Sequence, residues 1–370
     1  MNCESKKYRR IVVKIGSNVL TREDGRPDTT RISALVDQLA RLHRAGTEFI
    51  LVSSGAVASG RSLLETRVGR IDTVSARQLF SAVGQVKLLN RYYDLFNEYG
   101  IACGQVLTTK ESLSTRRQYL NQRNCMEAML AAGVMLANGV IPIVNENDTI
   151  SVTELMFTDN DELSGLVAAM MGAEALVILS NIDGIYDGSP SDPASQVIRR
   201  VAPGRDLSQY IDTARSSRGR GGMTTKSRIS SRAAGEGIEV VIANGRRDNI
   251  LTDLILTDRD VVCTRFEAAP RPASGVKKWI ASSEGFAKGA LHLDAGAAAA
   301  VSQSKAASIL AVGVTAVEGE FERDDIVRIL SPEGAPLGVG RISCDSATAR
   351  RNLGRKGLKP LIHCDYLYLE

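Results

Sequence analysis

Short, continuous runs of apolar residues recur along the first two-thirds of the chain, and longer segments with helical periodicity separate them. The runs are rich in Val and Ile and do not alternate strictly with polar residues, which is typical of strands buried on both faces. They lie at Ile11–Gly16, Phe49–Gly55, Ile101–Leu107, Val140–Asp148, Ala175–Asn181 and Ile238–Gly245. Helix-length segments include Thr29–Ala45, Val74–Tyr99 and Asn160–Met171. This alternation predicts an α/β fold with a mostly parallel sheet in an αβα sandwich.

The pattern changes at EAAPRPASG (Glu267–Gly275), which has two prolines, small residues and no periodicity. Beyond it, short strand candidates are separated by turns and not by long helices, which predicts a small, mostly-β barrel. We therefore predict two domains, residues 1–267 and 276–370, joined by a linker at residues 268–275.

The composition is that of a globular protein, with 370 residues, 44% hydrophobic and 24% charged residues, and a net charge of +4. Polar residues or proline interrupt the longest apolar runs, so we expect no membrane span and no membrane partner. The first residues, MNCESKKYRR, lead into a strand-like run without an apolar signal region, which predicts a cytoplasmic location. The mild net charge does not demand a nucleic-acid partner.

The cysteines and histidines argue against several kinds of site. Six cysteines are scattered without a C-x-x-C pair, so we expect neither a disulfide framework nor a structural zinc site. Three dispersed histidines lie outside any glycine-rich or acidic motif, which argues against a histidine-based catalytic triad. We predict no metal ion held by protein ligands alone.

Nearly every strand run ends in small or polar residues: GSN, SSGA, NENDT, SNIDG and NGR. In an open parallel sheet the ligand site lies beyond the carboxyl ends of the strands, so these tails are expected to converge on one cleft. Each tail taken alone is also compatible with an ordinary strand-to-helix turn. Five such tails together favour a shared site.

Two segments at strand ends suit an anion. Lys14 lies within the first apolar run, two residues before Gly16, and a buried lysine without an anion is costly. It is expected to reach phosphate or carboxylate at the strand end, unless it extends to solvent from an edge strand. SSGAVASG (Ser53–Gly60) places small residues where a helix begins, and a helix N-terminus can bind an anion or simply carry a serine cap.

Acidic and amide residues cluster in NENDT (Asn145–Thr149) and in FTDNDELSG (Phe157–Gly165). Such groups can recognise an amino group, orient lysines, or hold Mg²⁺ through water. Asp159 or Asn160 can alternatively cap the helix that follows. Capping alone does not account for both clusters.

GRGGMTTK (Gly219–Lys226) has the glycines, hydroxyls and lysine of a phosphate-binding segment, at or near the start of a helix. It departs from the Walker pattern, because no glycine immediately precedes Lys226. A solvated basic loop would have the same composition. Together with Lys14, however, Lys226 could flank a transferring phosphoryl group, because phosphoryl transfer needs mainly positioning and charge neutralisation.

These motifs resemble those of the amino-acid kinase family over about residues 9–266. The matching stretches are VVKIGSNVL, LVSSGAVASG, SARQLFSAVGQ, VIPIVNENDT, FTDNDELSGLVA, LVILSNIDGIY and GRGGMTTK. Within the family, they are most similar to members that phosphorylate the γ-carboxylate of L-glutamate with ATP and Mg²⁺, for proline synthesis. The tail, with GALHLDAGAAAAV, SILAVGVTAVEGEF and DIVRI, resembles a PUA domain.

The resemblance implies roles for individual residues. It makes Lys14, Lys226 and Asp159 catalytic, with Asp159 orienting the two lysines. It assigns glutamate binding to Ser54, Gly55, Asn145, Asp148 and Asn160. It assigns ATP binding to Lys14, Gly16, Ser180, Asn181, Arg220, Gly221, Gly222, Met223, Thr224, Thr225 and Lys226. It further implies a homo-oligomer and feedback inhibition by proline.

Four positions depart from the family pattern. Ser180 and Asn181 stand where Thr-Asp is frequent, Arg220 where threonine is common, and Met156 where some relatives have lysine. These changes are expected to affect nucleotide or substrate affinity and to leave the two lysines in place.

Two alternatives remain open from the sequence. One is a kinase for another acidic metabolite, such as aspartate or N-acetylglutamate. The other is an RNA-binding protein built around the PUA-like tail, which we do not expect to be the main function. Its basis is a group of six basic residues: Arg341, Arg350, Arg351, Arg355, Lys356 and Lys359.

Overall fold

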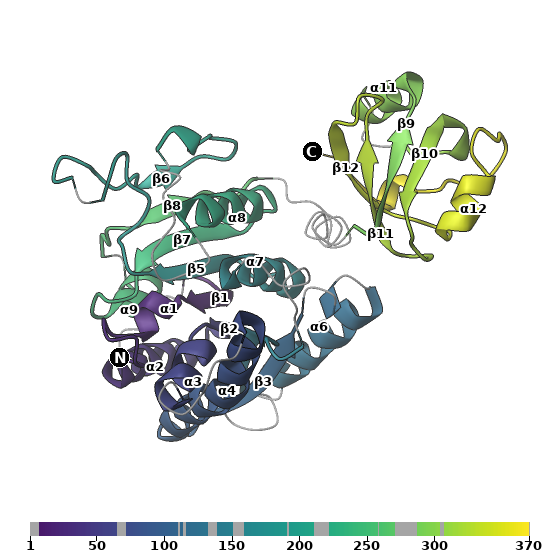
Figure 1. Ribbon diagram of the computed structural model, residues 1–370. Helices are drawn as coiled ribbons and strands as arrows, with labels where there is room; N and C mark the ends of the chain where they lie inside the picture. Colours follow the sequence, from purple (N-terminus) through teal and green to yellow (C-terminus); the bar gives the residue numbers. More distant parts are fainter. Residues whose placement is uncertain are drawn as a thin grey trace. The chain divides into compact units, whose positions relative to one another are not determined.

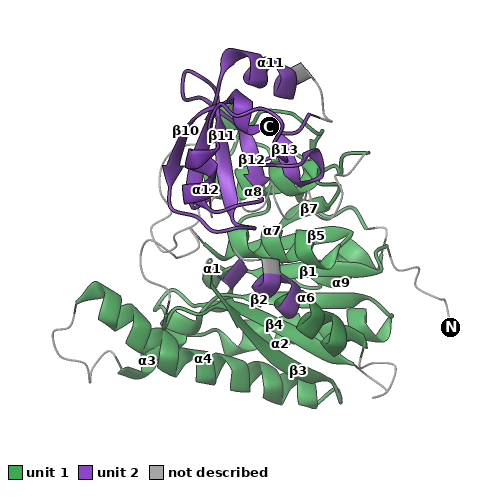
Figure 2. Cartoon of the chain, turned by 90° about the vertical axis from the view of Figure 1, so that its right-hand side faces the viewer, with its two compact units in different colours: residues 1–109, 122–272 green, residues 110–121, 273–370 purple. Residues whose placement is uncertain are grey.

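A computed structural model of the chain describes residues 7–64, 72–109, 112–113, 116–131, 139–150, 159–190, 192–210, 222–257, 259–270, 287–303 and 307–369. The chain divides into two compact units, residues 1–109 with 122–272 and residues 110–121 with 273–370 (Figure 2). The domain boundary at residues 268–275 stays a prediction, since residues 271–275 lie outside the described part.

The first unit is built on an eight-stranded sheet with the order β3-β4-β2-β1-β5-β7-β8-β6 (Figure 1). Its strands are β1 (Arg10–Ile15), β2 (Glu48–Ser53), β3 (Ala102–Thr108), β4 (Val140–Glu146), β5 (Ala175–Ser180), β6 (Arg200–Val201), β7 (Glu239–Asn244) and β8 (Thr264–Phe266). All pairs from β3 to β7 are parallel, whereas β8 runs antiparallel to β7. The predicted mostly parallel sheet is therefore confirmed.

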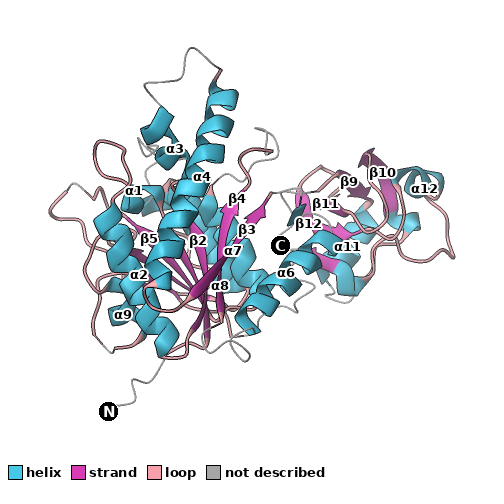
Figure 3. Cartoon of the chain, turned by 90° about the horizontal axis from the view of Figure 1, so that it is seen from below, coloured by secondary structure: helices cyan, strands magenta, loops and turns pink. Residues whose placement is uncertain are grey.

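Helices cover both faces of this sheet (Figure 3). Helices α2, α4 and α9 pack on one face, and α7 and α8 on the other. The helices of this unit are α1 (Ser17–Leu20), α2 (Thr29–Arg44), α3 (Ala56–Leu64), α4 (Thr73–Asn97), α7 (Asn160–Met171), α8 (Met223–Gly235) and α9 (Ile250–Ile255), and α6 (Arg116–Ala131) spans the point where the two units divide.

Strand β1 has both faces buried, and its side chains divide between the two layers of helices. Ile11, Val13 and Ile15 belong to the core cluster that also contains the apolar residues of α2. Val12 and Lys14 point to the opposite face, because successive side chains of a strand alternate. Lys14 is 5% exposed on this central strand, so the sequence-based alternative of an edge-strand lysine does not apply.

Strand β3 differs from the prediction that all six runs are buried on both faces. It lies at the edge of the sheet and pairs with β4 alone, and several of its side chains are partly or fully exposed. Side chains project above and below a sheet, so their exposure shows that the helix layers leave part of both faces of β3 uncovered at this edge.

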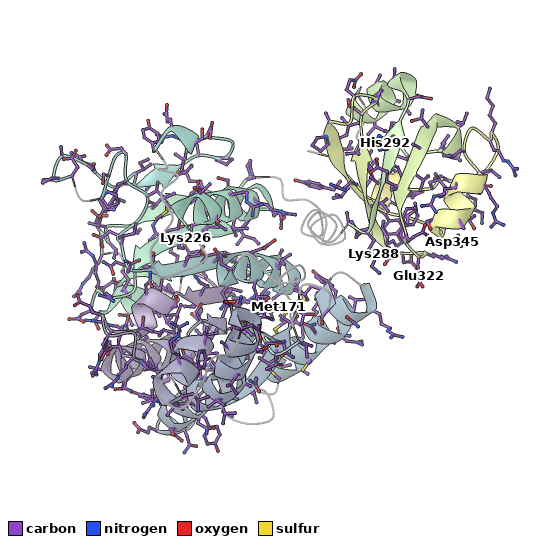
Figure 4. All side chains as sticks on the ribbon, in the orientation of Figure 1. Met171, Lys226, Lys288, His292, Glu322 and Asp345 are labelled. Carbon is purple, nitrogen blue, oxygen red and sulfur yellow. The ribbon has the colours of Figure 1, made fainter. Side chains whose placement is uncertain are left out.

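The second unit contains a five-stranded sheet with the order β10-β9-β11-β12-β13. Its elements are β9 (Gly289–Leu293), α11 (Ala295–Gln303), β10 (Val314–Gly319), β11 (Ile326–Leu330), β12 (Pro336–Arg341), α12 (Ser346–Arg351) and β13 (Leu367–Leu369). It has its own apolar core. Nζ of Lys288 lies 3.1 Å from Oδ1 of Asp325, and Nε2 of His292 lies 2.7 Å from Oε1 of Glu318. Lys288 and His292 are labelled in Figure 4.

Candidate active site

Two lysines from distant parts of the chain meet at one buried carboxylate. Nζ of Lys14, on β1, lies 2.5 Å from Oδ1 of Asp161, and Nζ of Lys226 lies 2.9 Å from Oδ2 of the same residue. Lys226 is on the first turn of α8 (Figure 4). Asp161 is fully buried in the first turn of α7. Two ammonium groups therefore share one buried carboxylate at the strand ends.

The sequence analysis assigned this contact with the lysines to Asp159, and the structure places it at Asp161. Asp159 is the N-cap of α7: its Oδ1 accepts hydrogen bonds from the backbone N–H groups of Asp161, at 2.8 Å, and Glu162, at 3.1 Å. The alternative that Asp159 caps the helix is thus the contact that forms. Because the cap side chain turns back onto the helix backbone, the carboxylate two residues later reaches the lysines.

The pKa values of the two aspartates are shifted in opposite directions. Burial raises the pKa of Asp161, but the charges of Lys14 and Lys226 more than offset this effect, so its pKa lies below the usual range. Burial and the neighbouring charge of Asp161 raise the pKa of Asp159 to about 6. Among the described residues, Oδ2 of Asp159 has no hydrogen-bond partner. It is a buried acceptor that lines a pocket.

The raised pKa of Asp159 predicts a pH effect on stability. Its pKa of about 6 in the folded chain exceeds the reference value of 3.8, so its contribution to stability is present below about pH 4 and is lost as the pH rises through 6. Asp159→Asn keeps a capping oxygen and removes this loss. Without nucleotide, the variant should gain on the order of 2 kcal/mol relative to wild type between pH 4 and pH 7. Denaturant unfolding of both proteins at several pH values measures this difference. If the free energies of unfolding of the two proteins changed with pH in the same way, the prediction would be wrong.

A second polar group lies at the ends of β2 and β4. Nδ2 of Asn160 donates to Oγ of Ser54 at 2.9 Å, to Oδ1 of Asn145 at 3.1 Å and to the carbonyl oxygen of Ser53 at 3.3 Å. Asn160 therefore contacts two other residues predicted to bind glutamate, Ser54 and Asn145, and Gly55 follows Ser54 directly. Asn160 is adjacent in sequence to Asp161, so this polar group and the lysine pair are parts of one site.

Helix α4 contributes three side chains that the sequence analysis did not select. Arg77 forms an ion pair with Asp148, Oγ of Ser81 donates to Asp148 at 3.0 Å, and Oε1 of Gln85 accepts from Nδ2 of Asn145 at 2.8 Å. The three recur at every fourth position, so they form one stripe along the helix. That spacing is visible in SARQLFSAVGQ and was the available signal.

Close contact between α3 and α4 holds this stripe in place. A Cβ atom on Gly84 would lie 1.8 Å from the carbonyl oxygen of Ala56, and one on Gly60 would lie 1.8 Å from that of Phe80. Both positions therefore require glycine, and the two backbones touch. The stripe of α4 is thereby fixed against the start of α3, which directly follows Ser54 and Gly55.

The residues predicted to bind ATP lie on the other side of the lysine pair. The N–H of Gly16 donates to the carbonyl oxygen of Leu179 at 3.0 Å, which ties the end of β1 to the end of β5 just before Ser180 and Asn181. Gly222 is the N-cap of α8, and Met223, Thr224 and Thr225 begin that helix. Arg220, Gly221 and Met156 lie outside the described residues.

One pocket of about 1700 Å³ joins the two sides. Twelve of the predicted site residues line it: Lys14, Gly16, Ser54, Gly55, Asn145, Asp148, Asp159, Asn160, Ser180, Asn181, Met223 and Lys226. Asp161 and Arg77 line it as well, whereas the described residues Gly222, Thr224 and Thr225 do not. The expectation that the strand tails converge on one cleft is confirmed for β1, β2, β4 and β5.

Two parts of the chain match the models of known protein families. Residues 9–244 match the model of the amino acid kinase family, and residues 289–361 match the model of the PUA domain. The chain belongs to the amino acid kinase family. Both family resemblances seen in the sequence are confirmed, and with them the expected fold of each part.

Curated relatives in this family align over almost the whole chain. A glutamate 5-kinase of Bacteroides thetaiotaomicron is 64% identical over 98% of this chain and 99% of its own length. One from Chlorobaculum tepidum is 45% identical, over 98% of both chains, and one from Shewanella amazonensis is 37% identical, over 99% of this chain and 95% of its own length. None of the described helices of this amino acid kinase is long and apolar enough to cross a membrane.

Proposed function

We propose that this amino acid kinase transfers the γ-phosphoryl group of ATP to the γ-carboxylate of L-glutamate, giving L-glutamyl 5-phosphate for proline synthesis. The observation that carries the proposal is the Lys14–Asp161–Lys226 cluster, which lies between an amide-rich and acidic end of one pocket and a glycine-rich end. The names of the curated relatives support the same activity.

The lysines would act by neutralising charge. An oxygen of the substrate carboxylate attacks the γ-phosphorus, a new P–O bond forms, and the bond to the oxygen bridging the β- and γ-phosphates breaks to release ADP. Negative charge then develops on the transferring group, where Lys14 and Lys226 can offset it. No general base is required, since the attacking carboxylate is already ionised at neutral pH.

Mg²⁺ fits the residues present. The partnerless Oδ2 of Asp159 is a hard oxygen ligand of the kind that Mg²⁺ prefers. We propose that Asp159 holds the cation that enters with ATP, either directly or through water. The cation would neutralise phosphate charge, while Asp161 remains committed to the lysines.

The amide-rich end would bind the amino acid. Arg77 and Ser81 hold the Asp148 carboxylate in place, and Asp148 and the side-chain oxygen of Asn160 are acceptors suited to an α-ammonium group. We propose that these two groups bind the α-ammonium of glutamate, so that the γ-carboxylate extends toward the lysines.

Substrate profiling tests the proposal. Purified protein with ATP and Mg²⁺ is expected to release ADP fastest with L-glutamate, and to form an acyl phosphate that hydroxylamine traps as a hydroxamate. L-Aspartate and N-acetyl-L-glutamate serve as comparisons. Faster turnover with either of them would favour a kinase for aspartate or for N-acetylglutamate and would reject the proposed glutamate kinase activity.

The second unit offers less support for a primary role in RNA binding. Arg350 pairs with Glu320 at 2.7 Å, and Arg341 lies 3.5 Å from Asp324 and stacks on the ring of Tyr366. Two of the six basic residues thus have acidic partners. The PUA match is compatible with RNA binding.

We retain homo-oligomerisation and inhibition by proline as proposals, tested by light scattering and by assays with added proline.

A further inference from the structure

The orientation of two side-chain amides at the amide-rich end is fixed by backbone groups. The N–H of Glu146 donates to Oδ1 of Asn145 at 2.9 Å, and the carbonyl oxygen of Ser53 accepts from Nδ2 of Asn160 at 3.3 Å. A backbone N–H can only donate and a backbone carbonyl can only accept. Neither amide can therefore rotate by 180° without placing donor against donor or acceptor against acceptor.

This orientation leaves Nδ2 of Asn145 as a buried donor that needs an acceptor. Gln85 supplies it through Oε1 at 2.8 Å, and the two residues are 8% and 3% exposed, which limits replacement by water. An unsatisfied donor at such a place carries a desolvation penalty. Asn145 then depends on Gln85 to keep its side chain in the plane that presents Oδ1 to Asn160.

The same chain of contacts determines what Asn160 presents to the pocket. Its Nδ2 is used by Ser54, Asn145 and the backbone, and no hydrogen bond from a described residue reaches its Oδ1. The residue lines the pocket, so the atom available to a ligand is an acceptor. With the Asp148 carboxylate nearby, the pocket favours a positively charged amine over an acylated nitrogen.

We propose that Gln85 is a positioning residue for amino-acid recognition, acting through Asn145 on Asn160, and that this chain favours substrates with a free α-ammonium group. The inference rests on the proposed function. Gln85 does not line the pocket itself, so its effect on a ligand is indirect. It differs in this from Asp148 and Asn160, which would touch the substrate.

Kinetics of two Gln85 variants test the proposal. Gln85→Met keeps the length of the side chain and removes the acceptor. It should raise KM for L-glutamate roughly tenfold, with kcat and KM for ATP much less affected, because one buried hydrogen bond is lost. The preference for L-glutamate over N-acetyl-L-glutamate should narrow. Gln85→Glu retains an acceptor oxygen, protonated or not, and should keep KM for L-glutamate within about threefold of wild type.

Gln38 provides the matched control. It is also a buried glutamine, on α2, with Nε2 donating to Ala34 at 3.0 Å and Oε1 accepting from Leu251 at 2.8 Å, and it does not line the pocket. Gln38→Met should lower the thermal midpoint without changing KM for L-glutamate. If Gln85→Met behaves in the same way, Gln85 is only structural and the proposal is wrong.

Two further outcomes keep the test decisive. If Gln85→Met does not fold, a tenfold rise in KM for L-glutamate in the folded Gln85→Glu variant would itself overturn the proposal, since that variant keeps the acceptor. A wild-type protein that does not phosphorylate L-glutamate would reject the proposed function. If the wild-type protein phosphorylates L-glutamate and Gln85→Met has an unchanged KM for L-glutamate, the proposed function stands and only the role of Gln85 is rejected.

Discussion

Replacing Asp161 by asparagine is expected to lower the turnover of glutamate phosphorylation by about 10²-fold or more. The Asp161 carboxylate lies between two ammonium groups, at 2.5 Å and 2.9 Å. A neutral amide would leave Lys14 and Lys226 as two close, poorly solvated charges of the same sign. They would move apart or lose a proton, and neither state holds two positive charges where the phosphoryl group transfers.

Steady-state release of ADP measures this effect, and Asp159→Asn is the informative comparison. Asp159 caps α7 and does not form an ion pair with the lysines, so its loss should weaken the interaction with Mg²⁺. Added Mg²⁺ should therefore partly restore Asp159→Asn and should not restore Asp161→Asn. Wild-type turnover in Asp161→Asn, or recovery of that variant by Mg²⁺, would contradict the assignment.

Lys226→Ala is expected to reduce turnover by about 10²-fold or more as well, because it removes a charge contact that strengthens as the phosphoryl group transfers. The side chain is 11% exposed and held by Asp161, so a solvent cation is not expected to replace it readily. The loss should appear in kcat more than in KM for L-glutamate, since the proposed mechanism places the lysine beside the transferring group and away from the amide-rich end.

Arg228→Ala is the control for this second variant. Arg228 is an exposed cation two residues further along α8 and does not line the pocket. Its removal changes the net charge by the same amount and should leave turnover unchanged. Equal losses in both variants would mean that general charge matters and that Lys226 has no specific role.

Much of the fold could be predicted because burial leaves a direct signal in the sequence. The six apolar runs correspond to the parallel strands β1, β2, β3, β4, β5 and β7, and helix α7 has the predicted bounds, Asn160–Met171. The short strands β6, at the edge of the sheet, and β8, beside it, were not predicted. Strands of two and three residues are too short to show a period, and only their partners in the sheet define them.

The site was predicted less completely, and the difference between Asp159 and Asp161 shows why. The motif D-N-D offers two carboxylates, and only the position of the first helical residue decides which one becomes the cap. The predicted helix start at Asn160 was right, but the family resemblance assigned the contact with the lysines to Asp159. Which of the two carboxylates reaches the lysines depends on the directions of the side chains, which the motif does not show. Gln85 was missed for another reason: α4 has several polar stripes, and its packing on α3 selects the one that faces the site.

The backbone groups that orient Asn145 and Asn160 have a consequence for protein engineering. A library that varies side chains around the pocket but keeps Asn145, Asn160 and Gln85 would leave the Glu146 amide and the Ser53 carbonyl to orient both amides, so the proposed preference for a charged amine should persist. Acceptance of acylated amino acids should therefore require either substitution within this trio of side chains or a changed path of the main chain at the ends of β2 and β4.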